Sequence, residues 1–296
     1  MALMRPSVPK NKLEMTYNYV NSCIFAIESN LPNYIIYMKK YILDLVVTQN
    51  TRLHANYVLI KMTHANPLPE MVPGQFAEIR IDGSTTTFLR RPISINFVDK
   101  EKNEVWFLVQ LVGDGTRKLA TVKVGDEVNV VLPLGNGYTL PQDKASVKPL
   151  LVGGGVGTAP MLMLGSTLAE MGYKPTFLLG ARSSKDLLQL DEFQKLGDVY
   201  MTTEDGSMGE KGYVTQHSVL EAQKFDMIYT CGPKPMMMAV AKYAKANGIE
   251  CEVSLENTMA CGVGACLCCV ENTDEGHLCV CKDGPVFNIK KLLWQI

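Results

Sequence analysis

Short runs of hydrophobic residues, separated by turn-forming residues, fill the chain between about residues 38 and 140. Four such runs cover residues 57–62, 76–81, 105–109 and 128–132. They are rich in the β-branched and aromatic residues that strands favour. Turn signals lie between them at Pro73-Gly74, Asp82-Gly83, Gly113-Asp114-Gly115 and Gly125-Asp126. Short strands at this spacing predict an antiparallel β-barrel over residues 38–141.

After Pro149 the pattern changes. Apolar runs at residues 150–152, 176–179, 199–202 and 227–230 alternate with helix-like segments, one over 161–171 and another ending near Asn247-Gly248. This alternation predicts an α/β domain with a doubly wound parallel sheet over residues 149–250. Residues 142–148 are polar and predict a linker. Residues 251–296 hold most of the cysteines and predict a small C-terminal module.

Residues 1–37 differ from the rest, with scattered tyrosines and no sustained periodicity. Two interpretations remain open. The segment is either the product of an upstream start choice, so that the functional chain begins near Met38, or an ordinary short helix packed on the first domain.

Composition limits the class of protein. The chain has 29 Lys+Arg and 30 Asp+Glu, a net charge of −1, which argues against a nucleic-acid partner. A hydrophobic content of 47% with 20% charged residues excludes wholesale disorder. Because no apolar run reaches about 18 residues, we expect no membrane span. Since we find no secretory signal either, we expect a cytoplasmic protein.

The cysteines are unevenly distributed, because six of the nine fall between Cys261 and Cys281. Four of them have the C-x4-C-x2-C…C spacing of plant-type [2Fe–2S] proteins. These predicted ligands are Cys261, Cys266, Cys269 and Cys281. The small residues between the first two allow backbone N–H groups to approach the cluster.

Two alternatives to this cluster assignment stay open. A zinc site is one, although zinc prefers two C-x2–4-C pairs and Cys279 and Cys281 are separated by a single residue. Cys279 also competes with Cys281 for the fourth position. Cys281 is favoured because it directly precedes the turn at residues 282–285.

Glycines follow the first strand of the predicted α/β domain, at Gly153, Gly154, Gly155 and Gly157, with Thr158 next. The position between a strand and a helix is typical of a dinucleotide loop, although the G-x-G-x-G spacing is a variant and a merely tight turn is the alternative. Cys231-Gly232-Pro233 and Asp205 follow later strands. Because ligands bind beyond the carboxyl ends of such strands, we expect these residues to line the same cleft, with Cys231 near the nicotinamide.

In the predicted barrel, Arg91 precedes Ser94 by three residues, and Gly115 and Thr116 lie where a turn leads into a helix. An arginine offers a planar fork to a pyrophosphate, and a helix N-terminus favours phosphate. Each signal is weak alone, but the pair is more informative.

This order of parts resembles the ferredoxin–NADP reductase superfamily, and more closely the family of electron-transfer subunits of class B dihydroorotate dehydrogenase. The most specific stretches are residues 261–270 and 280–287. The resemblance implies FAD bound by Arg91, Pro92, Ile93, Ser94, Leu108, Val109, Gln110, Gly115 and Thr116. It implies NAD bound by Gly153, Gly154, Gly155, Gly157, Thr158, Asp205, Cys231, Gly232 and Pro233. The wider superfamily has an aromatic residue at the position of Ile93.

The resemblance also implies a function in pyrimidine (UMP) biosynthesis. Electrons from dihydroorotate, oxidised on an FMN-containing catalytic subunit, would cross the [2Fe–2S] cluster and FAD to NAD⁺. The expected assembly is a heterotetramer of two plus two subunits, with no dihydroorotate site on this chain and the rim around residues 261–269 as its docking face. NADP in place of NAD stays open, because Arg182 could bind a 2′-phosphate.

Two other functions are kept as alternatives. One is a relay subunit of a ferredoxin:NADP oxidoreductase or a sulfide dehydrogenase; one such group has Asp at the first cluster position, where this chain has Cys261. The other is a non-enzymatic zinc-binding interaction module, which would leave the glycine turns and the arginine–serine pair unexplained.

Overall fold

The computed structural model describes residues 39–142 and 147–296. The two interpretations of residues 1–37 therefore lie outside the described residues, as does most of the predicted linker. Residues from Lys40 to Ile296 form one unit. No helix in these two described ranges is long and apolar enough to cross a membrane.

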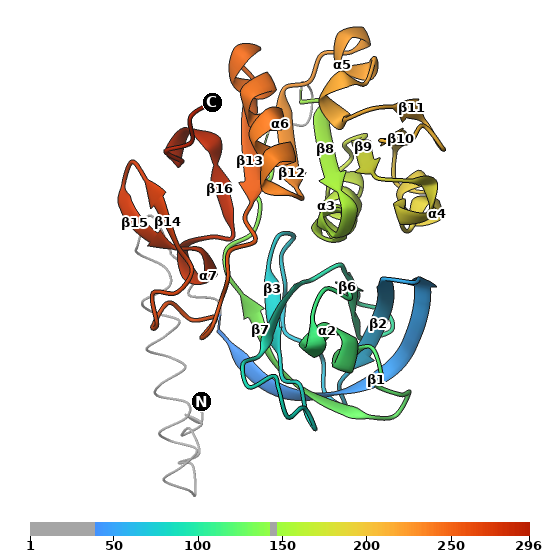
Figure 1. Cartoon of the computed structure of the whole chain (residues 1–296), viewed down its shortest axis with the longest axis vertical. Coiled ribbons are helices and arrows are strands. Elements are labelled where there is room, and N and C mark those ends of the chain that lie inside the picture. The colour runs from blue at the N-terminus through green and yellow to red at the C-terminus, as the bar shows by residue number, and fades with distance from the viewer. Residues whose placement is uncertain (1–38, 143–146) are drawn as a thin grey trace, which may run out of the picture. The chain divides into compact units, whose positions relative to one another are not determined.

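The first sheet is antiparallel and has seven strands in the order β4-β3-β7-β1-β2-β6-β5. They are β1 (Tyr41–His54), β2 (Tyr57–Thr63), β3 (Phe76–Ile79), β4 (Arg91–Ser94), β5 (Phe97–Asp99), β6 (Glu104–Gln110) and β7 (Glu127–Leu134). The sheet curls (Figure 1), and β4 also contacts β6. Helix α2 (Asp114–Leu119) follows β6. The predicted barrel is confirmed.

Turn chemistry and alternation explain this first sheet. The predicted turn glycines Gly83 and Gly125 have φ of +66° and +92°, a region that favours glycine. Along β3, Ala77 and Ile79 enter the barrel core, whereas Phe76 packs in a different core shared with the C-terminal residues. Glu78, between Ala77 and Ile79, therefore lies on the same outer face as Phe76.

The second sheet has the order β11-β10-β9-β8-β12-β13-β16, and all its pairs are parallel except β13 with β16. Its strands are β8 (Pro149–Gly154), β9 (Thr176–Ala181), β10 (Asp198–Thr203), β11 (Glu210–Lys211), β12 (Met227–Cys231), β13 (Glu250–Ser254) and β16 (Val286–Asn288). The chain winds from β8 outward to β11 and then crosses to β12, so the predicted doubly wound sheet is confirmed.

Helices cover both faces of this sheet because successive strand residues point to opposite sides. Leu151 packs with α3 (Ala159–Glu170) and α4 (Leu190–Gln194), whereas Leu150 and Val152 pack with α5 (Val219–Ala222) and α6 (Lys234–Ala246). Short 3₁₀ turns complete the connections. They are η1 (Gly155–Thr158), η2 (Ser184–Asp186), η3 (Val214–Gln216) and η4 (Ile289–Lys291).

The cysteine-rich end is joined to the second sheet. Strand β13, which the predicted boundary at residue 251 divides, is a full member of that sheet, and β16 returns to pair with it. Between them lie the hairpin β14 (Val270–Thr273) and β15 (Gly276–Cys279) and the short helix α7 (Val280–Asp283). We call residues 255–285 the cluster module. Its buried cysteines share a hydrophobic core with α6, so it is anchored by the sheet.

Candidate functional site

A cavity of about 800 Å³ is lined by residues of both the barrel and the second sheet. Its floor is the glycine loop after β8, with Gly232 and Pro233 after β12 beside it. Strands β8 and β12 are neighbours at the point where the winding of the sheet reverses. Open α/β sheets bind ligands at this place, beyond the carboxyl ends of the strands.

The glycine loop is shaped by close backbone contacts. A Cβ atom at position 157 would lie 2.4 Å from the carbonyl oxygen of Cys231. Gly154, Gly155 and Gly157 line the cavity, but Gly153 and Thr158 do not. The Thr158 hydroxyl instead donates to the Gly155 carbonyl at 3.0 Å. Of the predicted dinucleotide residues in this loop, three therefore face the cavity and two support it from behind.

The two sides of the cavity differ in charge. Arg182 and Glu204 line it beyond β9 and β10, and Glu256 lines it beyond β13. Because β9 and β13 lie on opposite sides of the β8–β12 pair, these charges flank the glycine loop. The predicted Asp205 is exposed and outside the lining; hydrogen bonds from Ser207 lower the pKa of its carboxyl.

The thiol of Cys231 lies behind the cavity wall. It is fully buried, and its Sγ is 3.9 Å from Oε1 of Glu256, which does line the cavity. Burial, followed by the Glu256 carboxylate, raises the pKa of Cys231, and burial also raises the pKa of Glu256. The role of Cys231 near the nicotinamide stays a prediction. Sequence reasoning missed Glu256, although it stands just beyond the carboxyl end of a parallel strand.

The predicted flavin segments meet in the barrel. A Cβ atom at Gly115 would lie 3.0 Å from Cδ of Arg91, so the arginine stem crosses directly over the turn that begins α2. Arg91 forms no ion pair with any residue the structure describes. The Thr116 hydroxyl accepts from the amides of Val112 and Gly113 at 3.1 and 3.2 Å. It therefore fixes the turn, while Arg91 keeps an unneutralised charge.

Some of the other predicted flavin residues are partly exposed or line the cavity, and others are buried in the hydrophobic core. Pro92, Ile93 and Ser94 are half-buried along β4. Leu108 and Val109 are buried in two different hydrophobic clusters, so only their backbone is available to a ligand. Gln110, at the end of β6, lines the cavity and so connects the strand predicted to pass the flavin with the cavity predicted to hold the dinucleotide.

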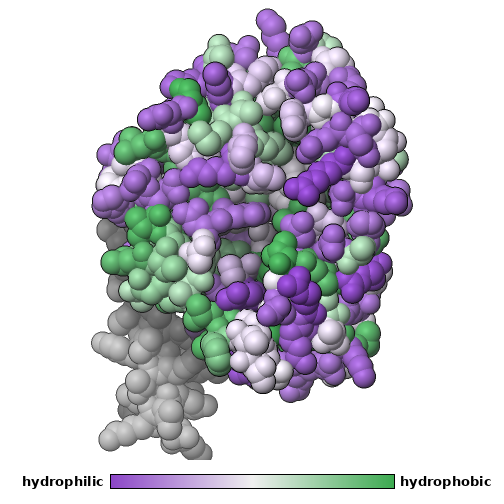
Figure 2. Space-filling view, viewed as in Figure 1, coloured by the Kyte–Doolittle hydropathy of each residue, from purple (hydrophilic) through white to green (hydrophobic). Residues whose placement is uncertain are grey.

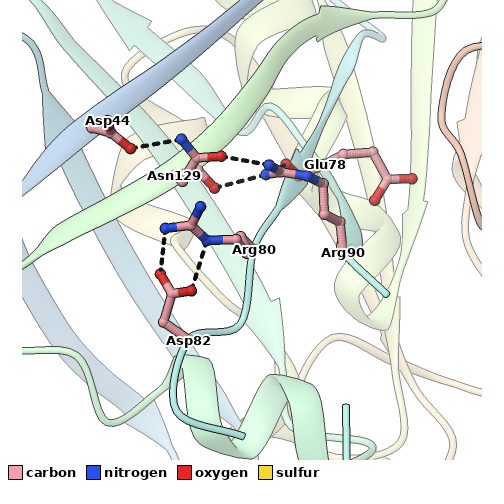
Figure 3. Close-up of polar contacts among 6 residues, drawn as sticks. All are labelled: Asp44, Glu78, Arg80, Asp82, Arg90 and Asn129. Carbon is pink, nitrogen blue, oxygen red and sulfur yellow. Dashed lines mark hydrogen bonds and ion pairs between the residues drawn. The ribbon is translucent and has the colours of Figure 1, made fainter. Parts of the chain in front are cut away.

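The two neighbouring arginines have different partners. Figure 3 shows Arg90 held by Asn129, which in turn donates to Asp44 at 2.6 Å. Arg90 also donates to the backbone carbonyl of Glu78 at 3.3 Å. It is therefore bonded directly to β3 and β7, and through Asn129 to β1, and Arg91 is the arginine left for a ligand.

Glu78 is an unusual residue on the outer face of β3. It is 1% exposed, and neither carboxyl oxygen has a hydrogen-bond partner among the described residues. Figure 3 shows its carboxyl turned away from the Arg90 guanidinium. A Cβ atom at Gly262 would lie 2.6 Å from Cγ of Glu78, so this side chain packs against the cluster module. Burial raises the pKa of Glu78 to about 7 although Arg91 and Arg90 oppose the shift.

The four predicted ligand thiols approach one another in two pairs. Cys261 interacts with Cys266, and Cys269 accepts from the amide of Cys281 at 3.3 Å. Burial alone would raise the pKa of Cys261, but backbone N–H groups of the loop outweigh it and lower the pKa to about 6. Burial and the adjacent Cys269 raise the pKa of Cys281 to about 12.

Backbone amides converge on these sulfurs. The amide of Gly264 donates to Cys281 Sγ at 3.1 Å, and those of Val263 and Ala265 donate to Cys261 Sγ at 3.5 and 3.3 Å. Gly262 and Gly264 have φ of +67° and +82°, which turns the loop so that its amides point inward. Amides directed at sulfur stabilise thiolate and sulfide charge.

The donor set fits a two-iron cluster. Within the described residues, no three His, Cys, Asp or Glu side chains come close enough together to hold a single metal ion. Two separated pairs of thiols, with amides directed at both, are what two irons with two cysteines each require. The remaining thiols differ in setting, since Cys268 is exposed and Cys279 is buried with Sγ 4.0 Å from the carbonyl oxygen of Gly264.

Comparison with known proteins decides the family. Residues 256–293 match the model of the iron–sulfur cluster binding domain of dihydroorotate dehydrogenase B, and residues 151–242 match an oxidoreductase NAD-binding domain. The chain is 42% identical over 226 residues to the dihydroorotate dehydrogenase B (NAD(+)) electron transfer subunit of Shouchella clausii, covering 75% of this chain and 86% of that protein. The subunit of the same name from Fusobacterium nucleatum is 38% identical over 250 residues, covering 82% and 95%. The chain belongs to this family.

Solved structures agree with the family on the fold. The structure of an NADH-dependent reduced ferredoxin-NADP oxidoreductase, studied for flavin-based electron bifurcation, matches with a TM-score of 0.75 and 30% identity, covering 84% of this chain and 90% of that one. An Amycolatopsis cytochrome P450 reductase matches with a TM-score of 0.62 and 22% identity over 74% of this chain and 69% of its own, which shows the fold alone. The predicted recognition and fold class are confirmed.

The family also bears on the predicted cofactors. The match to an iron–sulfur cluster binding domain includes all four predicted ligands, and the NAD-binding match includes the glycine loop. Together with the ferredoxin reductase-type fold, these findings support an iron–sulfur cluster, FAD and NAD for family members. Both relatives are named as one subunit of an enzyme, which implies a catalytic partner subunit. The individual site residues stay predictions.

Proposed function

We propose that this chain is the electron-transfer subunit of an NAD-linked dihydroorotate dehydrogenase, and that it carries electrons from an FMN-containing catalytic subunit to NAD⁺. The observation that carries the proposal is the thiol arrangement, because two pairs of cysteines are surrounded by inward-facing amides within the stretch that matches the family's cluster domain. When bound, FAD can exchange electrons singly with a cluster and in pairs with a nicotinamide.

The chain's own residues divide this work. Cys261, Cys266, Cys269 and Cys281 would hold the cluster, and the loop amides would stabilise its charge. Arg91, whose Nε donates to the Arg90 carbonyl at 2.9 Å but which forms no ion pair among the described residues, would bind the FAD pyrophosphate through its guanidinium, with the backbone of Gly115 and Thr116 beside it. The cavity would hold the dinucleotide over Gly155 and Gly157. Gln110 lines the cavity and ends the strand that we assign to the flavin, so it would fix the position of one site relative to the other.

The surface around the thiols supports docking of a partner. Val263 and Leu267 are 41% and 66% exposed, and Cys266 and Cys268 are exposed beside them. Figure 2 shows apolar colouring over the part of this face where Figure 1 draws the cluster module. Exposed apolar side chains around a redox site are typical of an interface. We infer that the FMN-containing subunit covers this rim, in an assembly of two plus two chains.

One finding favours a second candidate. The ferredoxin-NADP oxidoreductase structure covers most of both chains at 30% identity, so a relay subunit of that kind of enzyme is the alternative. Cys261 separates the two candidates, because one group of such relays has Asp at the first cluster position. Arg182 keeps NADP open as the dinucleotide.

The test is a visible spectrum of the purified chain, together with counts of iron, acid-labile sulfide and flavin. We expect two irons, two sulfides and one FAD per chain, and an electron paramagnetic resonance signal after reduction with dithionite. Adding the FMN-containing subunit should then restore dihydroorotate-dependent reduction of NAD⁺. A colourless protein with one zinc would contradict the proposal. Reduction of NAD⁺ or NADP⁺ by reduced ferredoxin, with no gain of dihydroorotate-dependent activity on adding the FMN-containing subunit, would favour the second candidate.

A further inference from the structure

The barrel contributes a tyrosine to the wall of the dinucleotide cavity. Tyr57 begins β2 and pairs in register with Gln110 at the end of β6, and both line the cavity. The Tyr57 ring is 4% exposed and packs with Leu108 of the barrel and with Ala159 and Leu188 of the α/β domain. Residues of both domains therefore fix the position of this ring.

The hydroxyl of Tyr57 has an unused proton. Nε2 of Gln110 donates to Oη of Tyr57 at 3.1 Å, which uses one of the two lone pairs of the oxygen. No described residue accepts the hydroxyl hydrogen in return. Burial, with the Asp186 carboxylate adding to it, raises the pKa of Tyr57 above its ordinary value. The hydroxyl is therefore a donor at neutral pH.

This donor faces the glycine loop. A Cβ atom at Gly155 would lie 3.9 Å from Oη of Tyr57, in ordinary van der Waals contact, and would meet nothing else within 4 Å, so the hydroxyl is the group nearest to that side of the glycine. Gly155 has a φ of +56° and begins η1, the 3₁₀ turn that leads into the 12-residue helix α3. A loop at the start of a helix favours phosphate through its free amides and the helix dipole. Buried donors are normally paired, so a missing acceptor is expected here.

We propose that the Tyr57 hydroxyl donates a hydrogen bond to the pyrophosphate of the bound nicotinamide dinucleotide. Tyr57 is then a positioning residue that the flavin barrel contributes to the dinucleotide site. The pyrophosphate is the group that fits, because Arg182 and Glu204 flank the loop on one side and Glu256 on the other, which leaves the centre of the ligand opposite Tyr57. The inference rests on the proposed function for the presence of a dinucleotide in the cavity.

The bond would couple two sites. Gln110 orients the Tyr57 hydroxyl and ends the strand that we assign to the flavin. A dinucleotide held by Tyr57 is therefore held at a fixed place relative to that strand. Because FAD also contains a pyrophosphate, the experiment must separate the two ligands.

The test uses the chain purified with its FAD and cluster, as wild type and as Tyr57→Phe. The affinity for NAD⁺ and for ADP-ribose, which lacks the nicotinamide, is measured by calorimetry. A lost hydrogen bond to a charged group predicts about 10- to 100-fold weaker binding of both ligands, with FAD and iron content unchanged. Tyr243→Phe is the matched control, because that hydroxyl donates to the carbonyl of Leu220 outside the cavity.

Three outcomes would overturn the inference. They are equal affinities for wild type and Tyr57→Phe, a loss limited to NAD⁺ with ADP-ribose unaffected, and a fall in FAD content. Tyr57→Met keeps an apolar side chain packed against Leu108, Ala159 and Leu188, and it should reproduce the loss of affinity if the hydroxyl is responsible. If the wild type itself binds no dinucleotide, the proposed function fails instead.

Discussion

Two glycine-rich loops, one after β8 and one between Cys261 and Cys266, use glycine for different physical reasons. In the first, the missing side chain allows close approach, since a Cβ atom at Gly157 would lie 2.4 Å from a backbone oxygen. In the second, Gly262 and Gly264 both have a positive φ, which aims amides at sulfur, in addition to the close packing of Gly262 on Glu78. The first loop leaves a cavity; the second surrounds its own thiols.

This difference predicts different dependence on the ligand. The dinucleotide loop is fixed by contacts to β12 that exist without any ligand, so it is preformed. The cluster loop gathers thiols that repel one another once ionised, and a metal centre is what compensates that charge. Changes to the first loop should therefore affect binding alone, whereas changes to the second should also affect folding of the cluster module.

The largest effect should come from removing a cluster ligand. In Cys281→Ser we expect electron transfer to or from the FMN-containing subunit to fall more than about 100-fold, because changes beyond the ligands already cost 10- to 100-fold at metal sites. NADH oxidation by an artificial acceptor, which needs only FAD, should survive. Stopped-flow and steady-state assays measure the two activities.

Cys268→Ser is the control for this variant, since Cys268 is exposed and outside the predicted ligand set. It should keep both activities and the full iron content. Equal loss of both activities in Cys281→Ser would contradict the contrast drawn between the two loops, because it would make the dinucleotide site depend on the cluster.

A methyl group in the dinucleotide loop should have the next largest effect. Gly157→Ala places Cβ against the Cys231 carbonyl, and neither backbone can move far. We expect the affinity for NAD⁺ to fall about 100-fold, as for a displacement of about 1 Å at a binding site, while iron and FAD content stay unchanged. Gly172→Ala is a comparison outside the loop, where a Cβ atom meets nothing within 4 Å although φ is +88°. Loss of iron in Gly157→Ala would show that the loops are not independent.

The sequence was sufficient to predict the features of the two loops that depend on a short stretch of chain. The apolar run Leu150-Leu151-Val152 predicted a buried strand, whose residues pack on both faces of the sheet, and the cysteine spacing predicted the thiol group. Residues whose role arises between distant segments were missed. The position of the Tyr57 hydroxyl in the cavity depends on Gln110 and Gly155. The burial of the Glu78 carboxyl depends on its packing against Gly262.

A rule based on sequence position could have found one of the missed residues but not the other. Glu256 stands two positions beyond the end of a parallel strand, a place where ligand residues are expected, so the same rule that selected Asp205 would have found it. Glu78 gave no signal. A single carboxylate in a strand usually faces solvent, and only the packing of the cluster module on β3 buries it.

Glu78 allows a test of how the cluster module contacts the barrel. Its pKa of about 7 means that the folded protein keeps a proton that the unfolded chain releases near 4.5. The stability contributed by this group is therefore fully present below about pH 4.5, falls as the pH rises to about 7, and stays low above that. Glu78→Gln should be more stable than wild type at pH 8, by at most about 3 kcal/mol, and nearly equal to it at pH 4.5.

Thermal unfolding of both proteins at pH 5 and pH 8 measures this difference. Glu101→Gln, at an exposed position, should shift neither value. A stability difference for Glu78→Gln that is the same at both pH values would mean that the carboxyl is ionised throughout or has a partner in solution.

The smallest effect is expected from a change at Cys279, which tests whether this thiol is one of the four cluster ligands. Its thiol is buried with Sγ 4.0 Å from the Gly264 carbonyl oxygen, an acceptor that would not stabilise a thiolate, whereas Cys281 Sγ accepts from the Gly264 amide. Cys279→Ala removes one buried sulfur and should lower stability by about 1 kcal/mol, with two irons per chain retained. Iron analysis and the reduced spectrum measure the outcome. Loss of iron here, with iron kept in Cys281→Ser, would move the fourth ligand to Cys279 and place the inward-facing amide of Gly264 on a sulfur that does not bind the cluster.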